Sequence, residues 1–295
     1  MSRKIENKGE VFAWSMYDFA NQPFTNLVVT FIYGTFFTTV IASNEIVGTQ
    51  QWSYAISITA IIVALSSPLM GALADRGGYR KMFMLGFTWL TIIATTALYF
   101  VMPGEVLRAL FWFVIANVGF EMGSVFCNAY LPDISHSKNI GRISGYGWSL
   151  GYVGGLIALA LAMVFLVQTD TPIFGFGKGE AGGYENIRAT NLLVAVWFAV
   201  FSIPTFLFVK DRKPETKALL KNVKHTVKDF RTTIKDLKEY PQIVRFLLAR
   251  LVYNDGLVTI FAFGGIYAAG SLDFTLDEII ILGIVLNITA GLGAF

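Results

Sequence analysis

Apolar residues along this chain gather into eight long runs, separated by segments rich in charged residues, glycine and proline. A helix needs about 20 mostly apolar residues to cross a membrane, because the hydrocarbon core of a bilayer is about 30 Å thick. Every run reaches about that length, so the pattern predicts an all-α membrane protein with eight spanning helices. The predicted spans are residues 11–41, 52–74, 82–102, 106–130, 143–167, 191–209, 243–269 and 277 onward.

Composition and charge add an orientation to this picture. The chain is 55% hydrophobic and 15% charged, whereas about 25% of the residues of a soluble protein are charged. Lys and Arg are concentrated at the N-terminus and after the second, fourth and sixth spans, and residues 210–238 alone carry ten of them. Cytoplasmic loops hold such an excess. We therefore expect an integral, multi-pass protein with a cytoplasmic N-terminus, in the plasma (inner) membrane if the source is bacterial.

Some chemistry is not expected from this composition. The single cysteine, Cys127, excludes an internal disulfide, and the two histidines, His136 and His225, lie far apart in polar segments. We expect no metal site, no cofactor, no enzymatic activity and no nucleic-acid partner. No small-residue cleavage site follows the basic N-terminus, so the first span is expected to stay in the mature protein.

Six spans, a basic linker and two further spans are the organisation of a transporter with two related halves. The expected parts are an N-terminal six-helix transmembrane half over residues 1–209, a cytoplasmic linker over 210–242 and the start of a second, incomplete half over 243–295. The chain ends without a polar residue to mark the inner membrane surface. We therefore expect it to be a truncated form of a longer chain.

The linker carries one apolar stripe at helical spacing, which predicts an amphipathic helix against the inner membrane surface or the bundle. A calmodulin-target-like or coiled-coil segment is the alternative interpretation. The stripe consists of Leu220, Val223, Val227, Phe230, Ile234 and Leu237.

A glycine-rich segment lies between the fifth and sixth spans, on the side opposite the basic loops. Gly177, Gly179 and Gly182 form a G-x-G-x-x-G sequence. That motif binds phosphate only between a strand and the start of a helix. A membrane span precedes it here, so we interpret the segment as a loop.

The segment after the second span, GALADRGGYRK, matches the pattern G-x-x-x-D-R-x-G-x-R-K in full. It resembles the signature loop of the major facilitator superfamily, and it stands where that family has it. The resemblance implies a major facilitator-type helical bundle and a latch at the cytoplasmic face. Glycine there allows close helix approach or a tight turn, and an acid can accept from a helix N-terminus. The expected latch residues are Gly71, Asp75, Arg76, Gly78, Arg80 and Lys81.

Four further blocks narrow the resemblance to the vacuole-effluxer-like branch, which includes an amino-acid exporter. They are YDFAN in the first span, NAYLPDI after the fourth, GRISGYGWSLGYVGG into the fifth and ARLVYNDG in the seventh. This likeness covers nearly all of the chain. It implies amino acids as substrates.

Polar residues inside three spans are the candidate binding site. Charges in a bilayer are costly and normally face a bundle interior or a water-filled cavity, so we expect these residues to line one cavity. Each group keeps helical spacing, and Trp14 and Tyr17 beside them are either part of the site or interfacial aromatics. The candidates for binding substrate or a proton are Asp18, Asn21, Asn117, Glu121, Asn128, Arg250, Asn254 and Asp255.

Pro23 adds a backbone group to this site. Proline has no N–H, so the carbonyl of Phe19, four residues earlier, loses its helix partner. We expect that carbonyl to be free to accept from a substrate amine or water. Glycines at 147, 151 and 155 are interpreted instead as close-packing positions.

The sequence thus predicts a secondary active transporter that moves a small polar solute by alternating access. A coupling proton carried by Asp18 or Glu121 is a further hypothesis. Two alternatives stay open: a permanent pair of Asp18 or Glu121 with Arg250 that only fixes packing, and a non-transporting membrane receptor, interaction protein or inactive transporter fragment.

Overall fold

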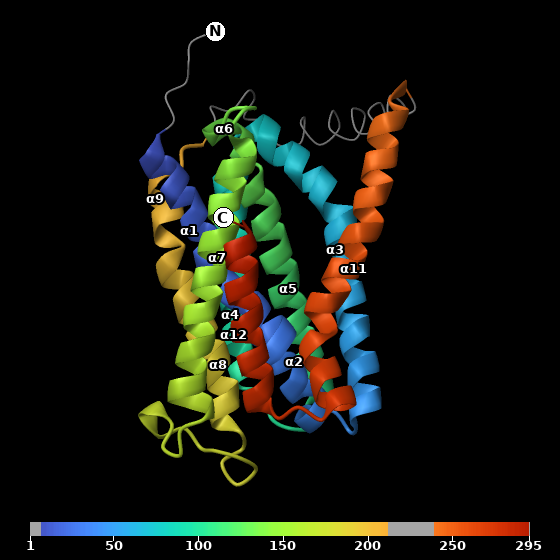
Figure 1. Ribbon diagram of the computed structural model, residues 1–295, viewed down its shortest axis with the longest axis vertical. Helices are drawn as coiled ribbons and strands as arrows, with labels where there is room; N and C mark the ends of the chain where they lie inside the picture. The colour runs from blue at the N-terminus through green and yellow to red at the C-terminus, as the bar shows by residue number, and fades with distance from the viewer. Residues whose placement is uncertain (1–6, 212–238, 295) are drawn as a thin grey trace.

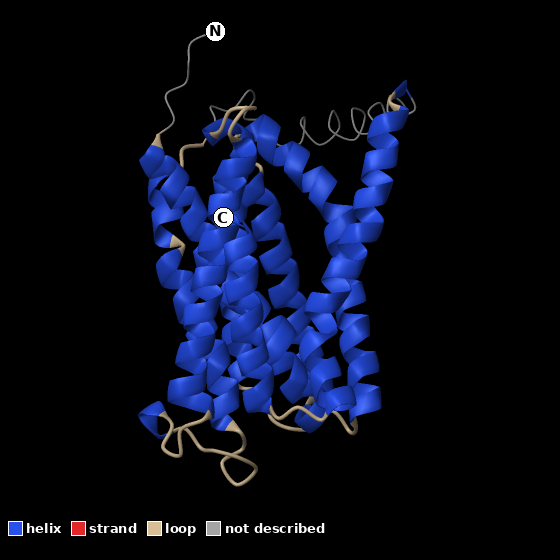
Figure 2. Cartoon of the chain, in the orientation of Figure 1, coloured by secondary structure: helices blue, strands red, loops and turns tan. Residues whose placement is uncertain are grey.

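The computed structural model describes residues 7–211 and 239–294, except for the side chains of residues 75–77. The described part is helical and contains no strand (Figure 2). Its elements, of which Figure 1 labels the α-helices, are α1 (Lys8–Pro23), η1 (Phe24–Phe31), α2 (Tyr33–Phe36), η2 (Phe37–Ile41), α3 (Glu45–Gly77), α4 (Arg80–Tyr99), α5 (Val106–Asn128), α6 (Leu131–Ile134), α7 (Ile140–Ala162), η3 (Met163–Val167), η4 (Ile173–Gly175), α8 (Glu185–Phe201), α9 (Ile203–Phe208), α11 (Pro241–Leu272) and α12 (Leu276–Ala294).

All eight predicted spans are confirmed as helices long and apolar enough to cross a membrane. The arrangement is an all-α bundle of the major facilitator type. The second span begins at Glu45 instead of residue 52, because the Asn44 side chain accepts from the Val47 N–H at 2.9 Å and caps polar turns onto the helix. The amphipathic helix predicted over residues 220–237 lies outside the described residues.

The spanning helices begin and end at two opposite ends of the bundle. We call the end where α1, α4, α7 and α11 begin the basic end, because Lys8, Arg80, Lys81 and Arg142 lie there. It is at the top of Figure 1. The opposite end carries the glycine-rich loop that precedes α8.

Pro23 changes the first span from an α-helix to a wider π-helix. In η1 and η2 the hydrogen bonds join residues five apart: the Ile32 N–H donates to the Leu27 carbonyl, and the Ala42 N–H donates to the Phe37 carbonyl at 2.9 Å. The short α2 between them is α-helical, with the Phe36 N–H donating to the Ile32 carbonyl at 2.8 Å. Such turns are rare and are found frequently at functional sites. The wider turns change the direction of every side chain after Pro23.

Glycines bring α1 and α7 into close contact, as the sequence predicts. A Cβ atom at Gly147 would lie 2.5 Å from Asp18 Oδ2, and one at Gly151 would lie 3.3 Å from the Asp18 carbonyl oxygen. A Cβ atom at Gly155 would collide with Asn26 Nδ2. The three glycines therefore form the surface of α7 that receives the first span.

The two helices of the second part meet the first half differently. Helix α12 packs along α7 as far as Gly145 near the basic end, where a Cβ atom would lie 2.9 Å from the Ala294 carbonyl oxygen, whereas α11 touches the first half mainly at the opposite end. No residue of α11 before Ala262 is buried. Beyond that point Gly265 lies against the Thr30 carbonyl, and Gly283 of α12 lies against the Phe31 ring. Figure 1 shows α11 leaning away from α7 and α12 at the basic end. In this conformation α11 meets the first half at the opposite end and diverges from α7 and α12 at the basic end.

The glycine-rich loop is tied to the ends of α4 and α8. Arg188 Nη1 donates to the Tyr99 carbonyl at 2.8 Å, and the Tyr99 hydroxyl donates to Glu185 Oε1 at 2.6 Å. Glu185 Oε2 accepts from the Gly177 N–H at 3.1 Å. These hydrogen bonds hold the loop against the ends of α4 and α8.

Candidate functional site

The eight residues proposed from sequence fall on three helices with different exposure. Asn21 on α1 and Asn117 on α5 are buried, and Asp18 is half-buried. The exposed members are Glu121, Asn128, Arg250, Asn254 and Asp255. The described residues form two cavities of about 380 and 600 Å³, and none of the eight residues lines either of them. That all eight line one cavity therefore stays a prediction.

Asp18 is positioned by the glycine face of α7. Its Oδ2 lies where a Cβ of Gly147 would otherwise stand. Among the described residues, no hydrogen bond or ion pair engages its carboxylate. Asp18 is thus a half-buried carboxylate that the described residues leave without a cation or a hydrogen-bond donor.

The polar stripe on α5 becomes more exposed toward the basic end. Asn117 is buried, Ser124 is half-buried, and Glu121 and Asn128 are exposed. Ser124 donates back to the Phe120 carbonyl at 3.0 Å, which satisfies its hydroxyl within the helix. Glu121 and Asn128 are left as the accessible groups of this stripe.

Arg250 is not paired with either acid in the described structure. It lies with Asn254 and Asp255 on the exposed part of α11. No salt bridge within residues 7–211 and 239–294 joins it to Asp18 or Glu121. A permanent packing pair is therefore not formed in this conformation.

The expectation of a free Phe19 carbonyl is wrong. The Trp197 indole donates to that oxygen at 3.0 Å, and its ring stacks on the Phe19 ring with centroids 5.2 Å apart. A side chain of α8 thus replaces the N–H that Pro23 lacks. A buried carbonyl without a partner costs as much as a lost hydrogen bond, which explains why the fold fills this position.

Trp14 and Tyr17 have structural roles at the basic end of α1. The Trp14 indole donates to the Cys127 carbonyl at 2.8 Å, and the Tyr17 hydroxyl lies 2.8 Å from Thr88 Oγ1. Both side chains are buried. Together they fix α1 against α5 and α4.

A pair of amides that sequence reasoning missed joins the two halves. Asn26 Nδ2 donates to Asn287 Oδ1 at 2.9 Å, and Asn287 Nδ2 donates to the Gly283 carbonyl at 2.8 Å. Both asparagines are buried. The sequence does show an asparagine within each of two apolar runs. Because a buried polar group needs a partner, this could have indicated that the two amides pair.

The amide pair lies beside a cavity of about 380 Å³ between η1, α7, α11 and α12. The Thr30 hydroxyl, also on its wall, is buried and has no hydrogen-bond partner. The remaining walls are mostly apolar, with Tyr152 and Thr289 as further polar groups. Such a mixture is typical of small-molecule sites.

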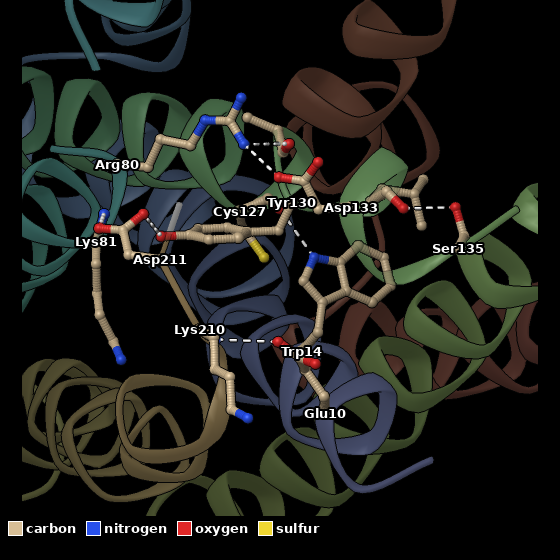
Figure 3. A network of polar contacts seen from close by, with 12 residues as sticks. Glu10, Trp14, Arg80, Lys81, Cys127, Tyr130, Asp133, Ser135, Lys210 and Asp211 are labelled. Carbon is tan, nitrogen blue, oxygen red and sulfur yellow. Dashed lines mark hydrogen bonds and ion pairs between the residues drawn. The ribbon is translucent and has the colours of Figure 1, made fainter. Parts of the chain in front are cut away.

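The signature loop takes part in a polar network at the basic end (Figure 3). Arg80 Nη1 donates to Asp133 Oδ2 at 2.7 Å and to the Ala129 carbonyl at 3.2 Å. The side chains of Arg80 and Asp133 are 8% and 12% exposed. This nearly buried ion pair joins the start of α4 to the short helix α6.

A second part of the network holds the segment after α9. The Tyr130 hydroxyl donates to Asp211 Oδ1 at 3.0 Å, and the Lys81 N–H donates to Asp211 Oδ2 at 3.3 Å (Figure 3). Lys81 Nζ donates to the Val209 carbonyl at 2.8 Å. Glu10 Oε1 accepts from the Lys210 N–H at 3.0 Å. The partners Asp133, Tyr130 and Asp211 were not predicted from sequence.

The other signature residues divide into three groups. Gly78 has a φ of 66° and ends α3 in the left-handed conformation, which confirms the tight turn. The close approach expected at Gly71 is wrong for the described residues, since a Cβ there would meet nothing within 4 Å. The side chains of Asp75 and Arg76 lie outside the described part, so their role in a latch stays a prediction.

Comparison with known proteins agrees with the resemblance to transporters that the signature loop indicates. Residues 41–141 and 134–295 match the family described as "Vacuole effluxer Atg22 like". The MFS-type transporter YxiO of Bacillus subtilis (strain 168) is 26% identical over 265 residues, which cover 87% of this chain and 59% of that protein. Autophagy-related protein 22 of Yarrowia lipolytica (strain CLIB 122 / E 150) is 21% identical, with 82% of this chain and 52% of that protein covered. The chain thus spans between half and three fifths of the length of these two curated relatives.

Proposed function

Since the chain belongs to the family of Atg22-like vacuole effluxers, we propose that it is a secondary active transporter that moves a small polar solute by alternating access. The N-terminal half comprises residues 1–209, the linker 210–242, and residues 243–295 begin the second half. The basic end faces the cytoplasm in this proposal, because cytoplasmic loops are rich in Lys and Arg.

The proposal of a carrier depends on how the second half contacts the first half. The second half packs on η1 through Gly265 and Gly283 at the opposite end, while α11 has no buried residue before Ala262. Glu121 and Asn128 are exposed on the part of α5 near the basic end. A carrier open to one side needs this combination of one closed end and accessible polar groups toward the other.

Amino acids are the proposed substrates. This rests on the family likeness, together with the presence of both carboxylates and a guanidinium on the candidate helices. A zwitterion has an amine that Asp18 or Glu121 can bind and a carboxylate that Arg250 can bind bidentately. The amides Asn21, Asn117, Asn128 and Asn254 would supply the uncharged hydrogen bonds.

Proton coupling is proposed for Asp18 and Glu121. Asp18 has no cation beside it in the described structure. In a conformation that excludes water from the site, its negative charge would be unpaired, so binding a proton would lower the free energy of that conformation. A proton can then enter and leave with each change of conformation. Intramembrane acids serve as proton relays in many transporters.

Flux in proteoliposomes tests both parts of this function. We expect the purified chain to accumulate a mixture of radiolabelled amino acids when a pH gradient is imposed. Asp18→Asn or Glu121→Gln should abolish the response to the gradient while exchange without a gradient continues. Unchanged coupling in both variants would contradict the proton proposal, and no flux from folded wild-type protein would contradict transport itself.

A further inference from the structure

A cavity of about 600 Å³ lies between α1 and α7 near the basic end, apart from the candidate site. The two helices run side by side in the same direction, as Figure 1 shows. Both the first turn of α1 and the first turn of α7 contribute to its rim. Its walls are formed by Lys8, Val11, Phe12, Ser15, Arg142, Tyr146, Ser149, Leu150 and Val153.

Two cations stand at the rim of this cavity. Lys8 is the first residue of α1, and Arg142 is the third residue of α7. Both are exposed. No salt bridge in residues 7–211 and 239–294 involves either of them. Their positive charge is therefore available to a ligand.

The polarity of the walls changes with depth along the helices. From the cations inward, the lining becomes apolar, with Phe12 59% and Val153 45% exposed. Arg142 and Val153 are eleven residues apart on α7, which corresponds to roughly 16 Å along the helix. A ligand that fits this surface has an anionic group at one end and an apolar chain at the other.

One buried hydroxyl adds a polar group inside the cavity. Ser149 Oγ is buried and has no hydrogen-bond partner. Ser15, across the cavity on α1, already donates to the Val11 carbonyl at 3.0 Å. An unpaired hydroxyl in an apolar wall costs free energy unless a ligand binds it.

We propose that this cavity binds one anionic phospholipid. The phosphate lies between Lys8 and Arg142, a headgroup or glycerol oxygen accepts from Ser149 Oγ–H, and an acyl chain follows Phe12 and Val153. Basic pockets between membrane helices on the cytoplasmic side are known to bind anionic headgroups. Apolar walls continuous with the cations fit a lipid better than a free phosphate ion, which would leave them uncovered.

The lipid would also stabilise the packing of the first span. Gly147 and Gly151 on the same helix hold Asp18, so a ligand that bridges α1 and α7 keeps that contact in place. The cavity does not share a residue with the eight candidate substrate residues. The proposed lipid therefore occupies a site separate from the proposed substrate site, and its binding can be measured without transport.

Native mass spectrometry of the purified chain tests the proposal. We titrate the protein in a neutral detergent with phosphatidylglycerol or with phosphatidylcholine of the same acyl chains. We expect one phosphatidylglycerol molecule to bind with clear preference. The double variant Lys8→Gln/Arg142→Gln should weaken that binding about 30-fold, the effect of removing two cations at a membrane surface.

The matched control is Lys138→Gln/Arg245→Gln, which removes two exposed cations from the same end of the bundle and should retain the preference. Val153→Trp keeps both cations but fills the groove, and it should lose both lipids. Equal binding of the two lipids by wild-type protein, or equal weakening by the control, would overturn the proposal. Displacement of phosphatidylglycerol by millimolar inorganic phosphate would show an anion site and would also overturn it.

Discussion

At the scale of single residues, an uncharged contact joins the two halves. The Asn26–Asn287 hydrogen bond is buried and lies beside the 380 Å³ cavity, where the Thr30 hydroxyl has no partner. Ionised groups at this position would need full desolvation whenever the halves close. Amides form and break a hydrogen bond at lower cost, which suits a contact that separates in the proposed transport cycle.

The energy of this contact can be measured with a double-mutant cycle. Asn26→Leu and Asn287→Leu should each destabilise the protein by about 1–3 kcal/mol, because each leaves the other amide unpaired. The double variant should lose less than the sum, with a coupling of about 0.6–1.7 kcal/mol, the range for hydrogen bonds between membrane helices. Thermal unfolding in detergent gives these values. Additive losses would show that the two amides do not interact.

At the scale of elements, apolar runs alone predicted the number and type of the spans. Lipid imposes this simple rule, because every backbone group in the membrane must be satisfied within a helix. The glycine face of α7 was also predicted, because Gly147, Gly151 and Gly155 are spaced by four residues. The side-chain directions after Pro23 were not. In a regular α-helix, Thr25 would lie on the same face as Asp18 and Asn21. In the π-helical turns after Pro23, the buried polar residue is Asn26 instead.

The sequence also could not show which residue donates to the backbone carbonyl that Pro23 leaves unpaired. Pro23 identifies the Phe19 carbonyl as unpaired, but Trp197, which donates to it, lies 178 positions away. Only the packing of α8 on α1 brings them together. The signature loop shows the same limit: Arg80 and Lys81 were predicted, whereas Asp133 and Asp211 come from distant elements.

Helix packing at the glycine face can be tested with two matched alanine variants. Gly147→Ala places a Cβ 2.5 Å from Asp18 Oδ2 and 2.9 Å from the buried Trp14 ring, so overpacking should cost about 1–3 kcal/mol. Gly86→Ala on α4 meets nothing within 4 Å and should be neutral or stabilise by up to about 1 kcal/mol. Chemical denaturation followed by circular dichroism measures both. Equal effects of the two variants would contradict the close α1–α7 contact.

At the scale of the whole molecule, α12 packs along α7, whereas α11 contacts the first half mainly toward the opposite end. Gly265 and Gly283 contact η1 toward the opposite end, and the Asn26–Asn287 pair lies about midway along the first span and α12. The polar network of Arg80, Asp133 and Asp211 holds the first half together at the basic end. Alternating access requires the closed end to open in turn. In the proposed alternating-access cycle, we expect the contact at Asn26 and Asn287 to separate as the opposite end opens.

Reversible cross-linking of that contact tests the account most directly. Cys127 is the only cysteine, so Asn26→Cys and Asn287→Cys can be introduced into a Cys127→Ala background. We expect a short, cleavable bifunctional thiol reagent to join the pair and to stop amino-acid flux in proteoliposomes, and cleavage of the reagent to restore it. Undiminished flux from fully cross-linked protein would contradict alternating access between these halves.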